Sequence, residues 1–176
     1  MRRVADADRI RALLEALGRA SDEPGRLYLT GGATAVLLGW RPTTIDVDNH
    51  LAPERDAVLR AIARLKDELA INVELAAPSH FIPELPGWED RSVFVMQAGG
   101  LTVFHYDPYA QALAKIERGH ARDMSDVAEL LHRGLVQPDL LLGLFQQIEP
   151  LLYHYPAIDP AGFRRAVEAA VRRDPV

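Results

Sequence analysis

The sequence predicts an α/β protein: a small mixed sheet forms the core, with one helix before it and a helical annex after it. Three observations support this class. Before Asp107, short apolar segments rich in β-branched residues alternate with helical patterns. Beyond Asp107-Pro108, only the helical pattern continues. The chain of 176 residues is 48% hydrophobic and 26% charged, an ordinary balance that is sufficient to bury a core.

Residues 1–106 are expected to form the α/β core. Near the N-terminus four apolar residues recur at helical spacing and predict an amphipathic helix: Ile10, Leu13, Leu14 and Leu17. The elements expected next are a strand over 26–30, a short helix over 33–39, a strand over 43–48, a helix over 54–69 and a strand over 71–76. A proline-rich loop is expected over 78–90. Two apolar segments around Gly99-Gly100 then predict a hairpin over 91–106.

Residues 107–176 are expected to form the helical annex, packed on the core. The helical pattern predicts helices over about 108–118, 124–133, 138–149 and 160–173. Asp107 precedes Pro108 and is expected to cap the first of these helices. Asp123 is expected to cap the second.

The composition excludes several classes of protein. The absence of cysteine excludes disulfides, thiolate zinc sites and cysteine nucleophiles, and it is compatible with the cytoplasm, where we expect the protein to work. The N-terminal residues are too charged for a secretory signal, and no apolar segment approaches the ~20 residues of a membrane span. We therefore expect no membrane partner. A net charge of −5 argues against a protein coated for nucleic acid but allows a local basic patch.

The segment Asp46-Val47-Asp48 places two acids on a predicted strand. Because side chains alternate along a strand, the two aspartates share one face, with their Cα atoms roughly 6.6 Å apart. They repel each other unless a cation lies between them, and Mg²⁺ or Mn²⁺ accepts such oxygen ligands. Glu74 can join them if its strand is adjacent, which would give the three carboxylates of two-metal phosphoryl or nucleotidyl transfer. The alternative is a solvated strand end.

Gly31-Gly32 lies between a predicted strand and a predicted helix. Glycines at such a turn let backbone N–H groups approach a phosphate, and the following helix adds partial positive charge. Thr34 can supply a hydroxyl. The alternative interpretation is a simple turn at the start of a helix.

Several cations can contact phosphate. Lys115, Arg118 and Arg122 would share one helical face if that helix continued past Gly119. A solvated helix face is the alternative, and Asp126 can pair with Lys115 or Arg122. Arg41 precedes the aspartate strand and can neutralise the acids or contact a phosphate.

The glycine pair, the Asp46-Val47-Asp48 segment after thirteen intervening residues, and Glu74 on the next strand together resemble the nucleotidyltransferase superfamily typified by DNA polymerase beta. Within it, the segments GGATAVLLGWRPTTIDVD and LAKIERGHARDMSDV are most similar to AbiEii-type and related bacterial nucleotidyltransferases. Many of those belong to toxin–antitoxin pairs. The resemblance extends over roughly residues 26–133. Ala33, where many relatives carry serine or threonine, and Asn49, where an apolar residue is usual, depart from the pattern.

The resemblance implies a role for each matched residue. Gly31 and Gly32 would hold the triphosphate of an NTP, with Lys115 on its phosphates. Asp46 and Asp48 would bind two Mg²⁺ or Mn²⁺ ions. Glu74, the third carboxylate, would orient or deprotonate the acceptor hydroxyl.

The expected activity is transfer of a nucleoside monophosphate from an NTP to a hydroxyl of RNA or protein, with a cognate toxin or antitoxin as an expected partner. The alternative is a domain that keeps the fold and binds a nucleotide or a partner without turnover. An intact set of three carboxylates favours the enzyme.

Overall fold

The computed structural model describes residues 3–172, and these form two compact units. Unit 1 consists of Met1–Ala77 and Ser92–Tyr106, and unit 2 consists of Pro78–Arg91 and Asp107–Val176. The segment 78–91, which the sequence suggested as a loop of the core, thus belongs to unit 2. Within the described residues, no helix combines the length and apolar character needed to span a bilayer.

Unit 1 is a mixed five-stranded sheet with three helices, and its fold class is the one predicted. The helices are α1 (Ala7–Ala20), α2 (Gly31–Leu37) and α3 (Asp56–Glu68). The strands are β1 (Gly25–Thr30), β2 (Asp46–Ala52), β3 (Asn72–Leu75), β4 (Val93–Ala98) and β5 (Leu101–His105). They are arranged in the order β3-β2-β1-β5-β4.

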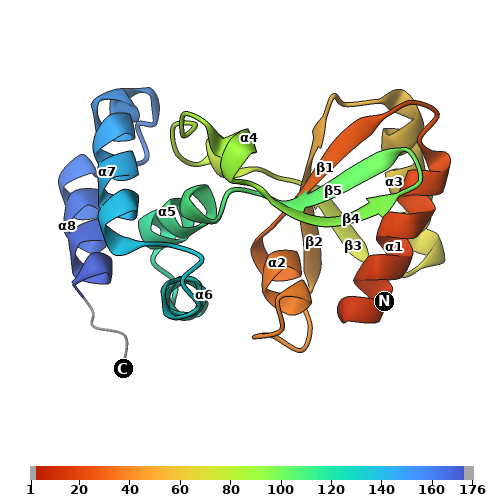
Figure 1. Cartoon of the computed structure of the whole chain (residues 1–176), viewed down its shortest axis with the longest axis horizontal. Coiled ribbons are helices and arrows are strands. Elements are labelled where there is room, and N and C mark those ends of the chain that lie inside the picture. The colour runs from red at the N-terminus through yellow and green to blue at the C-terminus, as the bar shows by residue number, and fades with distance from the viewer. Residues whose placement is uncertain (1–2, 173–176) are drawn as a thin grey trace. The chain divides into compact units, whose positions relative to one another are not determined.

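The two faces of the sheet differ in character. The inner face carries Leu27 and Leu29 of β1 and Val47 of β2, and these pack with the apolar stripes of α1 and α3 in one core. Figure 1 shows both helices against this side of the sheet. Since neighbours along a strand point to opposite faces, Asp46 and Asp48 lie on the outer face, away from α1 and α3.

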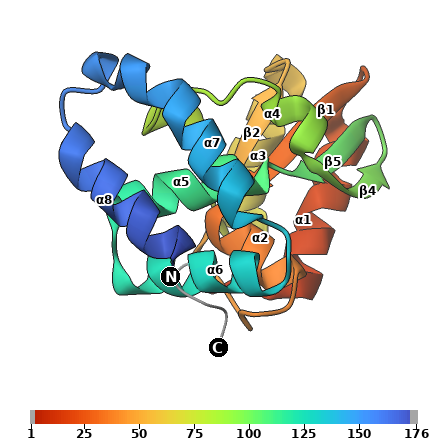
Figure 2. The same ribbon diagram turned by 60° about the vertical axis from the view of Figure 1, so that its left-hand side comes forward.

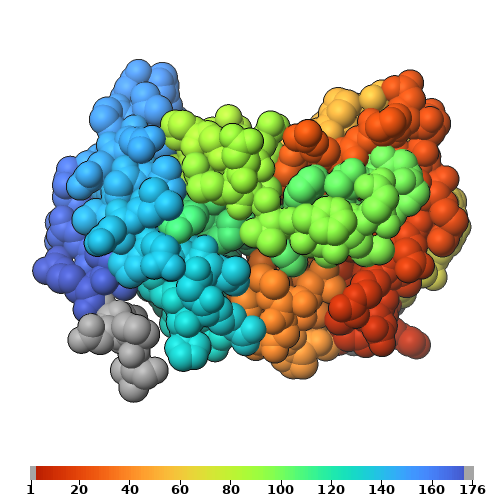
Figure 3. Space-filling model, in the orientation of Figure 1, coloured from red at the N-terminus to blue at the C-terminus, as the bar shows by residue number. Residues whose placement is uncertain are grey.

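The β4–β5 hairpin lies close to α1. A Cβ on Gly18 would overlap the carbonyl group of Ala98, so only glycine allows this approach of helix to strand. The Gly100 N–H donates to the Gly18 carbonyl at 3.2 Å. Figure 3 shows the hairpin, in green, at the surface beside α1.

Unit 2 is helical. Its α-helices are α4 (Trp88–Arg91), α5 (Pro108–Arg118), α6 (Ala121–His132), α7 (Pro138–Ile148) and α8 (Pro160–Val171), with the 3₁₀ helices η1 (Pro78–His80) and η2 (Glu149–His154). The most buried of these is α5, which contacts η1, α6, α7 and α8. Figure 2 shows α7 and α8 side by side. The rings of Phe145 and Phe163 pack edge to face between them, 4.9 Å apart.

The segment 78–91 is joined to the rest of unit 2 by polar contacts. Arg91 donates to the buried carboxylate of Asp107 at 2.7 and 3.0 Å, and the Tyr155 hydroxyl donates to the Ser79 carbonyl at 2.9 Å. Asp107 also accepts from the Tyr109 N–H, which confirms it as the N-cap of α5. Burial raises the pKa of the Asp107 carboxyl, although Arg91 opposes this effect.

The starts of β2 and α6 are among the element boundaries that differ from those predicted. Strand β2 begins at Asp46, three residues later than expected, because Thr44 forms only an isolated bridge with Ala5. Helix α6 begins at Ala121 with His120 at its N-cap position, so the prediction that Asp123 caps this helix was wrong. Asp123 lies within the first turn, where its side chain pairs with cations of α5.

Candidate functional site

The three predicted carboxylates come from two neighbouring strands of unit 1. Strands β2 and β3 are parallel, with Asp48 opposite Glu74 and Asp46 opposite Asn72. This confirms that the two strands pair and that Glu74 shares a face with both aspartates. Asp46 and Asp48 are partly buried, while Glu74 is exposed. The three carboxylates therefore share one face of two adjacent strands, near the start of β2.

Asn72 connects two of these acids. Its side-chain amide donates to Asp46 Oδ1 at 2.5 Å and to Glu74 Oε1 at 2.9 Å. The amide therefore engages one oxygen of each of these carboxylates and supplies partial positive charge between them.

The glycine pair lies directly against the acids. Thr30, the last residue of β1, is opposite Asp48, and Gly31 follows with a φ of 60°. The left-handed φ favours glycine at this position, and a Cβ on Gly31 would lie 2.7 Å from Asp48 Oδ2, so a larger residue would displace that carboxylate. A Cβ on Gly32 would overlap Thr44 and would lie 3.7 Å from Nη1 of Arg41. The structure therefore brings Gly31, Gly32 and Arg41 to the aspartate end of β2.

Thr34, which the sequence suggested as a phosphate ligand, is buried rather than at the surface. It is 3% exposed, and its hydroxyl donates to the Leu29 carbonyl at 3.2 Å. Its oxygen also lies 3.2 Å from Nδ1 of His105, which is 4% exposed on the inner face of β5. The hydroxyl thus takes part in a buried hydrogen-bond group beneath α2.

Burial lowers the pKa of His105 from 6.5 to about 4, because charging the ring there would remove a cation from water. The unfolded chain therefore binds a proton between pH 6.5 and pH 4 that the folded chain does not. The contribution of His105 to the free energy of unfolding should be fully present above pH 6.5 and should fall by up to about 3 kcal/mol as the pH drops through this range.

Urea unfolding of the wild type and of His105→Gln at several pH values measures this contribution. The His105→Gln curve should be flatter, and an identical pH dependence would contradict the assignment. The exposed His132 provides a matched control, since His132→Gln should keep the wild-type slope.

Lys115 and Arg118 lie in unit 2, on α5. The Lys115 side chain is 9% exposed, and its ammonium is 2.6 Å from Asp126 and 3.5 Å from Asp123. Arg118 pairs with Asp123 at 2.5 and 2.7 Å. Burial alone would raise the pKa of Asp123, but the hydrogen bonds and charges of Arg118 and Lys115 outweigh it and hold that pKa below its usual value.

Lys115, Arg118 and Arg122 do not share one helix face. Gly119 ends α5 with a φ of 69°, and Arg122 lies on the next helix, α6. Of the two partners suggested for Asp126, Lys115 is observed. Lys115 is therefore buried rather than on a solvated helix face, and it belongs to a group of two cations and two carboxylates in which the Arg118 side chain is 52% exposed.

The acids of unit 1 fit a divalent cation that arrives with a substrate. Among residues 3–172, no three His, Asp or Glu side chains converge in a group that could hold a metal ion. Mg²⁺ is usually bound by one or two carboxylates together with waters and substrate phosphates rather than by a complete protein cage. Asp46 and Asp48, both oxygen donors on one strand face, match that donor set, and the Gly31 backbone lies against Asp48 where a phosphate would complete it.

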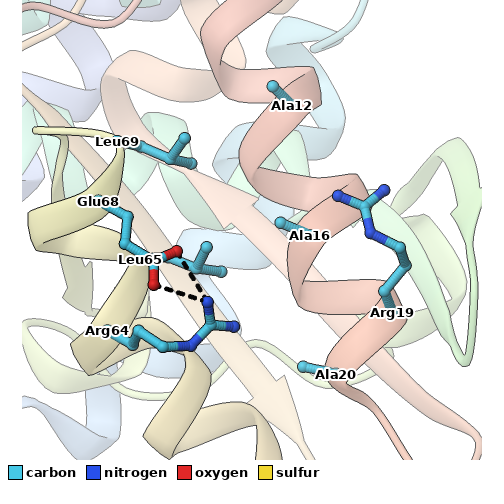
Figure 4. Close-up of a pocket in the computed structure, with 8 residues that line it drawn as sticks. All are labelled: Ala12, Ala16, Arg19, Ala20, Arg64, Leu65, Glu68 and Leu69. Carbon is cyan, nitrogen blue, oxygen red and sulfur yellow. Dashed lines mark hydrogen bonds and ion pairs between the residues drawn. The ribbon is translucent and has the colours of Figure 1, made fainter.

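A hollow of about 410 Å³ lies between α1 and α3, on the helices that cover the other face of the sheet (Figure 4). Its walls are mainly alanine and leucine side chains, and Arg64 donates to Glu68 at 2.7 and 2.8 Å across one edge. None of the residues predicted for the site lines it.

Sequence reasoning missed two polar residues, one beside the acids and one beneath the glycine turn. Asn72 is two positions before Glu74 and therefore shares its face, a signal that the sequence contained. His105 gave no signal, because its spacing fits no ligand pattern and only the three-dimensional structure places it under Thr34.

The comparisons with known proteins identify a family for this chain. No curated protein and no solved structure matches the chain. A family described as "Nucleotidyltransferase of unknown function (DUF6036)" matches residues 7–157, which includes the glycine pair, all three carboxylates and the Lys115 group. That match extends over most of both units, and the chain belongs to this nucleotidyltransferase family.

Proposed function

We propose that the protein transfers a nucleoside monophosphate from an NTP to a hydroxyl group of RNA or of a protein, with the acids of β2 and β3 as the catalytic centre. The observation that carries the proposal is the register of β1, β2 and β3. It brings Asp48 opposite Glu74 and next to Gly31, whose backbone conformation only glycine adopts readily. A carboxylate pair that could hold a cation is thus adjacent to the glycine turn that could approach a phosphate.

Each residue has a role in this reaction. Asp46 and Asp48 would hold Mg²⁺ or Mn²⁺, which when bound would neutralise charge on the phosphates and orient them. The Gly31-Gly32 backbone and Arg41 would contact the triphosphate. Glu74 would accept the proton of the acceptor hydroxyl while the oxygen of that hydroxyl bonds to the α-phosphorus. The bond between the α-phosphorus and the bridging oxygen breaks, and pyrophosphate leaves.

The buried positions of Thr34 and Lys115 limit what they contribute. The Thr34 hydroxyl is bonded within the core, so we assign it to support of the glycine turn. Lys115 and Arg118 hold carboxylates of α6, and a direct phosphate contact by either cation would require sharing it with Asp123 or Asp126.

The proposal also includes a cellular location and a protein partner. Reasoning from the resemblance in its sequence, we propose that the chain works in the cytoplasm, where NTPs are available, and that it belongs to a toxin–antitoxin pair. A cognate toxin or antitoxin would then be its protein partner.

The test is transfer of label from the NTP. The full chain is incubated with each NTP labelled at the α-phosphate, with Mg²⁺ or Mn²⁺, and with total RNA or total cell protein as acceptor. Label should enter one class of acceptor, and no label should be incorporated when EDTA is present from the start. A γ-labelled NTP serves as the control, because nucleotidyl transfer releases the γ-phosphate as part of pyrophosphate. Binding of NTP without any transfer would instead support the non-catalytic nucleotide-binding domain.

A further inference from the structure

We propose that Asn72 is a positioning residue that sets the geometry of the acids for the cation. This inference rests on the function proposed above. Its basis is a contact pattern: one side-chain amide donates to Asp46 Oδ1 at 2.5 Å and to Glu74 Oε1 at 2.9 Å. Asn72 is opposite Asp46 in the strand register and two residues before Glu74, so all three share the outer face.

The two donors of the amide explain why this residue type suits the position. A –NH₂ group carries two N–H bonds about 120° apart and can therefore serve two acceptors at once. Each bond engages one oxygen of a carboxylate and restricts the rotation of that carboxylate. The second oxygen of each acid is thereby directed rather than left to rotate. An aspartate at this position would add a further negative charge and no donor at neutral pH.

The neutral amide also reduces the cost of gathering acids. Asp46, Asp48 and Glu74 carry three like charges on adjacent strand positions, which destabilises the sheet locally. The partial positive charge of the amide offsets part of this repulsion without competing as a full charge against a cation. Asn72 therefore allows the acids to be ordered before the cation binds, and it lowers the conformational cost of binding.

Partners that orient metal ligands typically change metal affinity by about 10–100-fold when removed. We therefore expect Asn72→Ala to weaken binding of Mn²⁺ by at least about tenfold. The measurement is loss of the free Mn²⁺ signal in electron paramagnetic resonance, made on the full chain with Mn²⁺ alone and repeated with a non-hydrolysable NTP analogue. Asn72→Leu, which keeps the branched shape but has no donor, should behave in the same way.

Asn49 offers a matched control. It lies on β2 and its amide also bonds across to β3, donating to the Glu74 carbonyl at 3.1 Å, but its side chain is buried on the inner face away from the carboxylates. Asn49→Ala should lower the melting temperature and leave Mn²⁺ affinity within about twofold of the wild type, since the carboxylates keep their donors. A merely structural role for Asn72 would produce this same pattern.

The outcomes separate the inference from the function it rests on. If the wild type binds Mn²⁺ and Asn72→Ala binds it equally well or more tightly, the positioning role is wrong and the proposed function stands. If the wild type does not bind Mn²⁺ with or without the NTP analogue, the proposed metal centre fails, and the positioning role fails with it. Weaker binding in both Asn72 variants, with wild-type affinity in Asn49→Ala, supports the proposal.

Discussion

Replacement of either aspartate by asparagine should abolish nucleotidyl transfer while leaving the protein folded. Asp46→Asn or Asp48→Asn removes a charged cation ligand and keeps the size of the side chain. A bound metal contributes several kcal/mol of charge stabilisation in the transition state, so a loss of at least about 4 kcal/mol is expected, or about 10³-fold in rate. The rate is measured with the α-labelled NTP and acceptor identified in the transfer experiment.

The stability of these variants should move in the opposite direction. Asp46 and Asp48 lie on one face of β2, so removing one charge relieves repulsion between like charges. The melting temperature without metal should therefore be equal to or higher than that of the wild type. Mg²⁺ or Mn²⁺ should raise the melting temperature of the wild type, because the cation binds the folded state, and should have no such effect on the double variant.

Asp8 provides the control for these substitutions. It is an aspartate of unit 1 with a side chain that is 96% exposed on α1, where it pairs only loosely with Arg11 at 3.4 Å. Asp8→Asn should keep both the transfer rate and the response to metal. Full activity in Asp46→Asn and in Asp48→Asn would instead show that the acids of β2 are not the catalytic centre.

Most of the secondary structure was predictable because local patterns and tertiary structure agree. The N-terminal helix follows from the spacing of Ile10, Leu13 and Leu17, and all three are buried in the core of unit 1. Helix α5 begins at Pro108 and ends before Gly119, as the restricted φ of proline and the left-handed conformation of glycine dictate. In these segments the chain carries its own boundary signals.

The second strand was only partly predictable. Its start was misplaced because Thr43, Thr44 and Ile45 have β-branched side chains, which favour strands, yet Ile45 is exposed and Thr44 has a single bridge partner. Its end was missed because Asn49 and His50 are polar. These residues are in the strand because β1 pairs with them, and that pairing depends on residues distant in the sequence.

The candidate site shows the same division. That Glu74 shares a face with Asp48 was predictable, because two short apolar segments separated by a helix favour parallel neighbours. The contacts of Asn72 with the acids depend on side-chain conformation, which spacing alone does not reveal. For Lys115, a phosphate contact, a pair with Asp126 and a solvated helix face were all compatible with the sequence. Only the packing of α5 against α6 selects Asp126.

Removal of Lys115 should strongly destabilise unit 2. Its ammonium lies 2.6 Å from the carboxylate of Asp126 and 3.5 Å from that of Asp123, and both carboxylates are almost fully buried. Because the carboxylates stay buried when the cation is removed, its loss leaves negative charge without a partner cation from Lys115. Lys115→Met removes the cation and keeps the apolar stem, so the cost should be about 3–5 kcal/mol, the usual penalty for removing one member of a buried ion pair. Chemical unfolding measures it.

A double-mutant cycle tests whether the pair is the cause. Asp126→Leu should also be destabilising, and the double variant Lys115→Met/Asp126→Leu should lose clearly less than the sum of the two single changes, because no buried charge of the pair remains. Arg64 and Glu68 form the control pair, with side chains 56% and 50% exposed on α3. Arg64→Met should cost no more than about 0.5 kcal/mol, since solvent screens such pairs. Strictly additive losses at Lys115 and Asp126 would contradict the coupling.

The same variants separate a structural role of Lys115 from a contact with the triphosphate. NTP binding is measured by calorimetry at a temperature at which every variant is folded. Lys115→Met removes the cation, whereas Asp126→Leu keeps it and takes away its nearest carboxylate. If the ammonium contacts a phosphate, Lys115→Met should weaken binding and Asp126→Leu should preserve or strengthen it, because the cation is no longer shared. If both variants weaken binding to the same degree, Lys115 acts only through the fold of unit 2, and the triphosphate is held by the glycine backbone and Arg41.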